Sequence, residues 1–518
     1  MQNLYLVALS FVLLYAVRKL IDYRRNIKAI RNFPGYRTAI PAASILGNLL
    51  PRIPGIVPGR LCVWEPKHGD FDYFGCDMFS SISLFPNRIE MSVCDATTIK
   101  EITSSRARWP KPIEQYGALN FFGKNIITTE DDEWKKHRKV ANPAFSERNN
   151  KMVWEETVKI VNEMFNTIWK DKKEVVVEHC VDITLPLALL VIGTAGFGRA
   201  VSWEEDFNLP PGHKMSFKQA LHFVSTGLFW KVIFPNWAMG LHKKLREVRL
   251  AFKELETYMQ EMIDERRNAV KKVERFDLFT SLLDASEGED DGGTKLSDSE
   301  LRGNIFIFML AGHETTAHTL SYCFGLLAMY QDEQEKLYQH IKSVLSDGRA
   351  PTYSDMNALN YSTAVFYETL RIFPPVTAIP KMAAEDTTLV VGNQTGEKRT
   401  VVIPKGTEIM LHMPGLHYNP RYWKDPHEFK PQRFLEDYNR DAFLPFSGGA
   451  RQCLGRKFFE TEGIAILTNI VQKYKIEVKE EPQFANETFD ERRARIFKCT
   501  NGLTLTPVRV PLVFKRRD

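Results

Sequence analysis

The stretch of sequence that decides the fold is FSGGARQCLG, residues 446–455. It places Cys453 in a glycine-rich loop, directly before a run of helix-forming residues. The glycines let the backbone come close to the sulfur, so that amide N–H groups can point at it. The N-terminus of the following helix adds positive potential, and both effects favour a thiolate over a thiol. The loop therefore predicts a thiolate in a tight turn, which is a ligand type that haem iron takes.

The alternative is a buried structural cysteine, which is the common role of an isolated Cys. Here, however, the pattern is Phe-x-x-Gly-x-Arg-x-Cys-x-Gly. These fixed letters would arise by chance in about one of several thousand chains of this length. The pattern resembles the signature of the cytochrome P-450 family, the haem-thiolate monooxygenases, of the eukaryotic microsomal type with fungal members included. The resemblance implies haem b as cofactor and Cys453 as the axial ligand of its iron, with Phe446, Gly449 and Arg451 also at the haem.

A long helix is predicted upstream of this loop. Residues 285–300 (ASEGEDDGGTKLSDSE) form the sharpest break in composition and indicate an exposed acidic loop. The loop ends in Ser297-x-x-Glu300, a capping box, directly before an apolar run. We therefore expect a largely buried helix from near Asp298 to about Tyr330.

This helix carries the segment AGHETT, residues 311–316. Ala311 and Thr315 are four residues apart and share one helix face. The hydroxyl of Thr315 can bond back to a carbonyl and bend the helix. The segment resembles the oxygen-activation motif of the family. The resemblance implies that Ala311 and Gly312 leave room for dioxygen beside the haem, and that Glu314 and Thr315 are the catalytic pair, acting as a proton relay.

A third motif is Glu368-x-x-Arg371. An acid–base pair three residues apart is common on helices and alone indicates only surface electrostatics. The resemblance implies that this pair is buried and bound to Arg433 of the segment FKPQRF, residues 429–434. A buried network of three satisfies charges that are otherwise costly to bury. Its predicted role is structural.

A fourth motif, Trp134-x-x-x-Arg138, places an indole N–H and a guanidinium on one helix face, which suits a carboxylate. The resemblance assigns both to the haem propionates, together with Lys381, which can pair only as a point charge. The basic run at residues 135–139 has two interpretations. It is either a solvated helix face or a docking surface for an acidic redox partner.

Substrate-contacting side chains are expected, by the same resemblance, in several separate segments. They are apolar and include several aromatic rings, which favours a hydrophobic substrate such as a terpenoid, a sterol or a fatty-acid chain. We expect about half of them to belong to the core instead. The predicted pocket residues are Tyr116, Phe121, Phe122, Ile307, Phe308, Val376, Ile379 and Leu503.

The fold class implied is mainly α with a minor β portion, the cytochrome P-450 fold in a single catalytic domain. Helical periodicity dominates the middle of the chain, and strand signals are few. Residues 389–391 and 400–403 flank a turn and predict a hairpin. Residues 502–514 alternate apolar side chains but contain Pro507 and Pro511, so we expect at best an edge strand or a hairpin there.

The composition of the chain excludes several classes of protein. The chain has 518 residues, of which 44% are hydrophobic and 26% charged, which excludes a disordered chain and a polytopic membrane protein. The net charge of +5 is too mild to indicate a nucleic-acid partner. The 7 cysteines are odd in number and form no CxxC pair, which argues for a reducing compartment and against a disulfide framework or a structural zinc site.

The N-terminus predicts a membrane anchor. Leu4 to Val17 is a nearly uninterrupted apolar run, and positive charge follows it rather than preceding it. A cleaved signal peptide, the alternative, has the opposite arrangement. We therefore expect a single-pass anchor at residues 1–24 in the endoplasmic reticulum membrane, a basic and Pro/Gly-rich hinge at 25–60, and a cytosolic catalytic domain at 61–518.

Together these features predict an oxidoreductase that inserts one oxygen atom from O2 into a hydrophobic substrate. The chain is too short to carry a flavin reductase module as well, so NADPH-derived electrons are expected from a separate flavoprotein reductase. One alternative is a haem-thiolate isomerase or dehydratase that acts without O2, against which the Glu314–Thr315 pair speaks. A second is a non-catalytic haem carrier or gas sensor, which leaves the oxygen motif and the apolar pocket unexplained.

Overall fold

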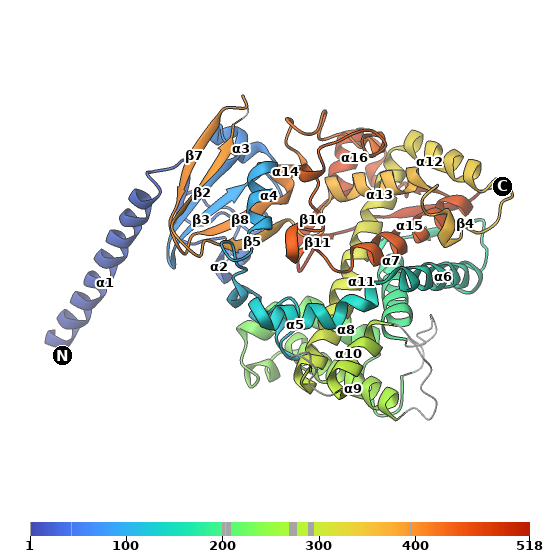
Figure 1. Ribbon diagram of the computed structural model, residues 1–518, viewed down its shortest axis with the longest axis horizontal. Helices are drawn as coiled ribbons and strands as arrows, with labels where there is room; N and C mark the ends of the chain where they lie inside the picture. The colour runs from blue at the N-terminus through green and yellow to red at the C-terminus, as the bar shows by residue number, and fades with distance from the viewer. Residues whose placement is uncertain are drawn as a thin grey trace. The chain divides into compact units, whose positions relative to one another are not determined.

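A computed structural model of the chain describes residues 2–42, 44–198, 203, 209–268, 277–288, 295–393 and 395–517 (Figure 1). It contains two compact units, each built from segments that are far apart in the sequence. The first unit consists of Met1–Pro112, Val376–Glu428 and Tyr438–Cys453. The second unit consists of Ile113–Pro375, Phe429–Asp437 and Leu454–Asp518. Cys453 is thus the last residue of the first unit, and the helix that follows it belongs to the second.

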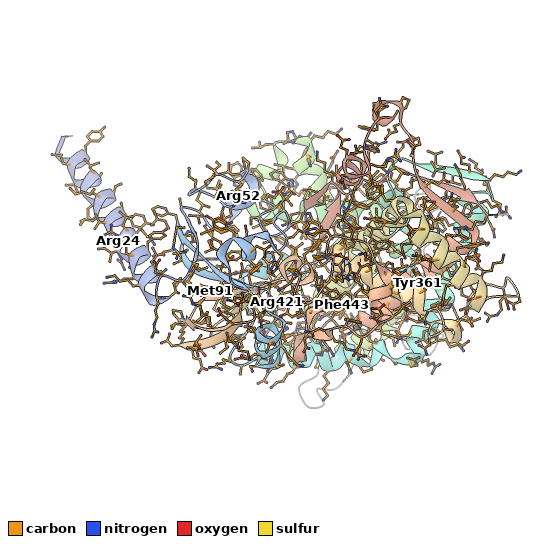
Figure 2. The ribbon with its side chains drawn as sticks, turned by 90° about the horizontal axis from the view of Figure 1, so that it is seen from above. Arg24, Arg52, Met91, Tyr361, Arg421 and Phe443 are labelled. Atoms are coloured by element: carbon orange, nitrogen blue, oxygen red, sulfur yellow. The ribbon has the colours of Figure 1, made fainter. Side chains whose placement is uncertain are left out.

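The first unit is built on a mixed five-stranded sheet with the strand order β1-β2-β3-β8-β5. β2 and β3 are antiparallel and pair Ser80 with Met91, which is labelled in Figure 2 and fully buried. β1 runs parallel to β2, and β8 runs parallel to β3. β5 forms the edge of the sheet and is antiparallel to β8. β6 and β7 form the hairpin predicted from residues 389–403. The strands are β1 (Gly35–Thr38), β2 (Met78–Leu84), β3 (Asn87–Val93), β5 (Ala378–Met382), β6 (Thr387–Gly392), β7 (Lys398–Ile403) and β8 (Glu408–His412).

The helix α1 (Gln2–Ala29) opens the first unit and extends away from its sheet (Figure 1). Among the described residues, no helix is long and apolar enough to cross a membrane. The prediction of a spanning anchor at residues 1–24 is therefore not supported. The apolar run is shorter than the roughly 20 residues that a span needs, and the helix continues through charged residues such as Arg18, Lys19 and Arg24. The other helices of this unit are α2 (Ile45–Leu49), α3 (Gly69–Phe74), α4 (Ala96–Ser104), α14 (Met413–His417), η9 (Arg440–Ala442) and η10 (Gly449–Arg451).

The second unit is mainly helical, and the helix α11 (Asp298–Met329) contacts its neighbours α7, α10, α13 and α15. Most residues of α11 are buried, as expected for a helix with apolar residues on all sides. It begins at the predicted capping box, where the Ser297 hydroxyl accepts from the Glu300 amide and the Glu300 carboxylate accepts from the Ser297 amide. The predicted bounds of the helix are confirmed. Residues 289–294 of the expected acidic loop lie outside the described residues.

The remaining helices of the second unit come before and after α11 in the sequence. Those before it are η1 (Ile113–Leu119), α5 (Asp131–Ala141), η2 (Asn142–Phe145), α6 (Glu147–Glu163), η3 (Met164–Ile168), α7 (Val181–Val191), η4 (Ile192–Gly196), α8 (Phe217–Ile233), η6 (Ala238–Gly240), α9 (Lys243–Arg267) and α10 (Leu278–Glu287). Those after it are α12 (Gln331–Val344), η7 (Tyr353–Asp355), α13 (Asn360–Ile372), η8 (Pro431–Phe434), α15 (Arg456–Lys473), η11 (Pro482–Phe484) and α16 (Phe489–Ile496). The fold class, mainly α with a minor β portion, is confirmed.

The C-terminal segment corrects one prediction. β12 (Leu512–Arg516) is not an edge strand but the centre of the antiparallel sheet β4-β12-β9, between β4 (Glu174–Val177) and β9 (Tyr474–Val478). Pro511 lies just before β12, so it removes no amide from the ladder. Further upstream, β10 (Cys499–Asn501) and β11 (Leu505–Pro507) form a short hairpin, as the other expectation for this segment allowed.

Candidate active site

The loop that carries Cys453 is fixed by its backbone. The Cys453 amide donates to the Phe446 carbonyl at 2.8 Å and closes the loop. Gly449 has a φ of +65°, and a Cβ there would collide with the backbone carbonyl of Thr103 at the end of α4. Only glycine meets both conditions without strain. The loop is therefore seated against α4 in a single conformation, and this conformation presents Cys453.

The thiol of Cys453 differs from the other cysteines in its exposure. All 7 cysteines lie in described residues, and Cys453 alone is exposed. Burial raises the pKa of Cys323 to about 12, and it raises the pKa of Cys94 well above its usual value. Such thiols stay protonated and inert. Cys453, the one exposed cysteine, is therefore the best placed of the seven to serve as a ligand.

The segment before Cys453 is anchored through a histidine. Phe443, labelled in Figure 2, stacks on the buried ring of His417 with ring centroids 5.7 Å apart. The next residue, Leu444, donates its amide to His417 Nε2 at 3.0 Å. In the same unit, Arg451 lies in η10 and is half-buried, while Lys381 lies in β5 and is buried. These two of the residues predicted to lie at the haem thus belong to the unit that carries the cysteine.

In the second unit, the oxygen motif interrupts the burial of α11. Ala311 is exposed although Leu310 before it is fully buried. The hydroxyl of Thr315 donates to the Ala311 carbonyl at 2.8 Å, as the spacing of the two residues allows. A Cβ at Gly312 would also come within 3.0 Å of the Ile192 side chain in η4. The face of Ala311 and Thr315 is therefore the accessible face of an otherwise buried helix.

Glu314 is a buried acid with an unsatisfied oxygen. Its side chain is 7% exposed, and its Oε2 atom has no hydrogen-bond partner among the described residues. Burial raises the pKa of Glu314 to about 7. The carboxyl can therefore take up and release a proton near neutral pH, which a general acid needs. Its neighbour His313 is bonded to the Met309 carbonyl, and burial lowers the pKa of His313 to about 4, so that ring stays neutral.

Trp134 and Arg138 share one face of α5, as their spacing predicts. The guanidinium carbon of Arg138 lies 5.7 Å from the Trp134 ring centroid. Trp134 is buried and Arg138 is half-buried. An indole N–H and a guanidinium on one helix face can together donate hydrogen bonds to a carboxylate.

The basic run on α5 is only partly at the surface. Lys136 forms an ion pair with Glu300. His137 is buried with its Nδ1 atom 2.8 Å from the amide of Asn304, and burial lowers its pKa to about 4. These two residues therefore join α5 to the start of α11. The solvent-exposed members of the run are Lys135 and Lys139, and both interpretations of the run stay open for them.

The structure brings Glu368, Arg371 and Arg433 into one network. Arg371 Nε lies 2.7 Å from Glu368 Oε2, and both side chains are fully buried. Arg433 Nε lies 3.1 Å from Glu368 Oε1, which also accepts the Lys430 amide at 3.0 Å. A single carboxylate thus holds α13 and η8 together.

The predicted pocket residues divide into three groups by their burial. Phe121, Val376 and Leu503 are more than a third exposed, at 38%, 41% and 42%, which is unusual for large apolar side chains. Tyr116, Phe308 and Ile379 are half-buried. Phe122 and Ile307 are buried, and the Phe122 ring packs 4.7 Å from that of Phe306, as a core residue does.

One of these segments is held by a contact for which the sequence contains no signal. His318 on α11 lies with its Nδ1 atom 2.7 Å from the hydroxyl of Thr504, and both residues are buried. The adjacent Leu505 amide donates to the Pro375 carbonyl at 2.9 Å. The chain is therefore fixed directly after Leu503, whose own side chain stays exposed. Because the partners are far apart in sequence, no local pattern could reveal them.

One other cluster of possible ligand atoms lies in the first unit, formed by His68, Asp77 and Cys94. His68 Nδ1 donates to the Gly415 carbonyl at 2.9 Å. Asp77 forms an ion pair with Arg421, which is labelled in Figure 2. One ring nitrogen of His68 and one oxygen of Asp77 are thus engaged, and the cationic Arg421 beside Asp77 disfavours a metal ion, so we assign this cluster a structural role.

Taken separately, each unit offers groups that suit a haem. The first unit offers an exposed thiol with two cationic side chains, and the second offers the pair of carboxylate donors on α5 and an accessible small residue, Ala311, on α11. Thiolate, guanidinium and indole are the groups that haem iron and propionates require.

Comparison with known proteins gives the same result. Residues 80–495 match the family model described as Cytochrome P-450. The chain is 54% identical to "Cytochrome P-450 monooxygenase 124" of Postia placenta over 100% of both chains. It is 30% identical to "Cytochrome P-450 monooxygenase ORF6" of Penicillium roqueforti, over 88% of this chain and 84% of that one. Among solved structures, the cytochrome P-450DA heme domain matches with a TM-score of 0.75, covering 94% of this chain and 98% of that chain at 22% identity, which shows the fold alone.

Replacing Glu368 by glutamine tests the buried network. The change keeps the shape but leaves Arg371 without its carboxylate, so we expect the free energy of unfolding to fall by about 3–5 kcal/mol. The matched control is Glu133→Gln in the same unit, which breaks an exposed ion pair with Lys124 and should cost at most about 1 kcal/mol. Thermal or denaturant unfolding of the two variants measures the difference. Equal losses would show that the network carries no special weight.

Proposed function

Because the chain belongs to the cytochrome P-450 family, we propose that it inserts one oxygen atom from O2 into a hydrophobic substrate, with electrons from NADPH through a separate flavoprotein reductase. Membership of a monooxygenase family makes the protein an oxidoreductase. The observation that carries the proposal is the loop fixed at Gly449, which leaves Cys453 as the exposed cysteine.

The chain's own residues supply the cofactor site. Cys453 would hold the haem iron as a thiolate, and Trp134, Arg138, Arg451 and Lys381 would hold the propionates. When bound, the haem supplies the activation of dioxygen, which electron donation from a thiolate favours. Everything else that the protein does is binding, orientation and proton transfer.

Proton transfer falls to Glu314 and Thr315. Glu314 can exchange its proton at neutral pH because burial raises its pKa to about 7. The Thr315 hydroxyl, bonded to the Ala311 carbonyl, can accept one proton while it gives up another. The two neighbours on α11 form an acid and a relay on the accessible part of the helix.

The substrate proposal rests on the exposed apolar side chains. Phe121 and Leu503 in the second unit and Val376 in the first keep large apolar surfaces accessible. Such surfaces are typical of sites that bind apolar ligands. This supports a terpenoid, sterol or fatty-acid-like substrate over a polar one.

We also propose that α1 attaches the protein to the endoplasmic reticulum membrane with its catalytic part on the cytosolic side. Leu9, Phe11 and Leu14 of α1 are at least 66% exposed, which leaves a large apolar surface without a partner among the described residues. The basic residues that follow suit the headgroup region on the cytosolic side.

The function is tested by the spectrum of the reduced protein with carbon monoxide. We expect a strongly red-shifted Soret band, which thiolate ligation produces, and its loss in Cys453→Ser. The control Cys62→Ser removes a half-buried cysteine outside the loop and should keep the band. Turnover of apolar probes should then require NADPH, reductase and O2. A band typical of neutral ligation, or product formed without O2, would contradict the proposal.

The pH dependence of turnover tests Glu314. The protonated acid predominates below its pKa of about 7, so proton-limited turnover should fall by up to about tenfold per pH unit above that value. Glu314→Gln has no titrating proton and should be slow at every pH, with more hydrogen peroxide released per NADPH. An unchanged pH profile in Glu314→Gln would remove this residue from the proton path.

The same substitution has a readout in stability. The pKa of Glu314 is raised from 4.5 to about 7 in the folded protein, so its contribution to stability is present below pH 4.5 and is lost as the pH rises through 7. Glu314→Gln should therefore gain stability over the parent protein above pH 7 and not below pH 4.5.

Deletion of residues 1–29 tests the membrane proposal. The full chain should sediment with microsomal membranes and resist washing with high salt, because its attachment is apolar. The shortened chain should move to the supernatant and keep its carbon monoxide band. A full chain that stays in the supernatant would refute the attachment.

A further inference from the structure

A second buried acid lies next to the oxygen motif within the second unit. Glu462 is on α15, the helix that begins three residues after Cys453, and its side chain is fully buried. Its Oε2 atom lies 3.2 Å from the hydroxyl of Thr316 on α11. That hydroxyl also lies 3.0 Å from the carbonyl oxygen of Gly312. The three groups form a line from α15 into the turn of α11 that carries the motif.

The number of hydrogens in this line depends on the state of Glu462. The Thr316 hydroxyl has one hydrogen and can donate it once. An ionised Glu462 only accepts, so it would take that hydrogen and leave the Gly312 contact without one. A protonated Glu462 donates to Thr316, which then donates to the Gly312 carbonyl. The protonated form alone makes both contacts hydrogen bonds.

The surroundings of Glu462 favour the same state. Among the described residues, no lysine, arginine or histidine forms an ion pair with it, whereas Glu460 on the same helix pairs with Arg456 at 2.8 Å. An isolated carboxylate in a dry core is costly. Burial raises the pKa of Glu462 well above its usual value. In the part of the chain that the structure describes, the Thr316 hydroxyl is thus its one hydrogen-bonding partner, and the second oxygen, Oε1, has none.

We propose that Glu462 is a positioning residue, a neutral carboxylic acid that donates to Thr316 and thereby fixes the turn of α11 between Gly312 and Thr316. It holds its proton permanently and passes none to the reaction. The turn it fixes contains Glu314 and Thr315, so the inference rests on the proposed function for their role in proton transfer. Its effect on that role is geometric, because small displacements of reacting groups change rates strongly.

The test compares Glu462→Gln with Glu462→Leu in the haem-loaded full chain. The glutamine amide can donate to Thr316 as the acid does, but it carries no titrating proton; leucine removes the donor. We expect Glu462→Gln to keep the hydrogen–deuterium exchange of the α11 amides at residues 311–316 within about twofold of the parent protein. In Glu462→Leu, exchange there should be faster by on the order of tenfold.

Two further variants guard against a general loss of folding. Thr316→Val removes the acceptor and relay of the same line, and we expect it to match Glu462→Leu, with no added effect in the double variant. Thr319→Val is the control, since Thr319 is a buried residue of α11 whose hydroxyl has no hydrogen-bond partner among the described residues. It should leave the exchange at residues 311–316 unchanged.

The protonation state is read directly by infrared spectroscopy. A protonated carboxyl band should persist at about pH 8, well above the usual Glu pKa, and be missing from Glu462→Gln. Two results would overturn the proposal and make Glu462 a proton carrier. One is loss of that band near neutral pH. The other is amide exchange at residues 311–316 that is as fast in Glu462→Gln as in Glu462→Leu. Unchanged exchange in Glu462→Leu would overturn it as well. Neither readout needs substrate, so they stand apart from a failure of the proposed function.

Discussion

The carboxylate of Glu368 is the constraint on which the second unit depends. It is fully buried and binds two guanidiniums and one backbone amide, so its negative charge is shared by groups from two segments 65 residues apart. A buried pair is stable only while every partner is in place, because removing one leaves a charge in a medium that cannot solvate it. The segments that contain Arg371 and Arg433 must therefore fold together. The network acts as a condition on folding rather than as a sum of favourable contacts.

The same requirement for partners governs the polar residues of α11. Asn304 lies within hydrogen-bond distance of His137, His318 of Thr504, and His313 of its own backbone. Each of these contacts satisfies a group that burial would otherwise penalise. Glu314 departs from the rule, as the hydroxyls of Thr319, Ser321 and Tyr322 also do, since one of its oxygens is buried without a partner among the described residues. When such a departure occurs at a motif residue, function rather than packing explains why that residue is present.

Local signals made part of this structure predictable. The capping box at Ser297 and Glu300 sets the start of α11 from residues three apart, and the hairpin of β6 and β7 follows from a turn between two short runs. The centre of the sheet at β12 was missed, because its partners β4 and β9 come from other parts of the chain. The same limit applies at the site. Spacing alone placed Thr315 over Ala311, but the pairing of Thr316 with Glu462 joins residues 146 apart.

The two buried acids near the motif show how environment divides one residue type into two roles. Successive residues of a helix turn by about 100°, so the face of Ala311 and Thr315 has Glu314 on one side and Thr316 on the other. Glu462, the acid that contacts Thr316, uses its proton in a hydrogen bond. A proton that is part of a structural contact is held firmly. Among the described residues, each acid has one buried oxygen without a partner, but only Glu462 also has a hydroxyl, that of Thr316, to receive its proton. Burial raises the pKa of Glu314 to about 7, and an acid whose proton fills no structural contact can release and regain it without breaking one.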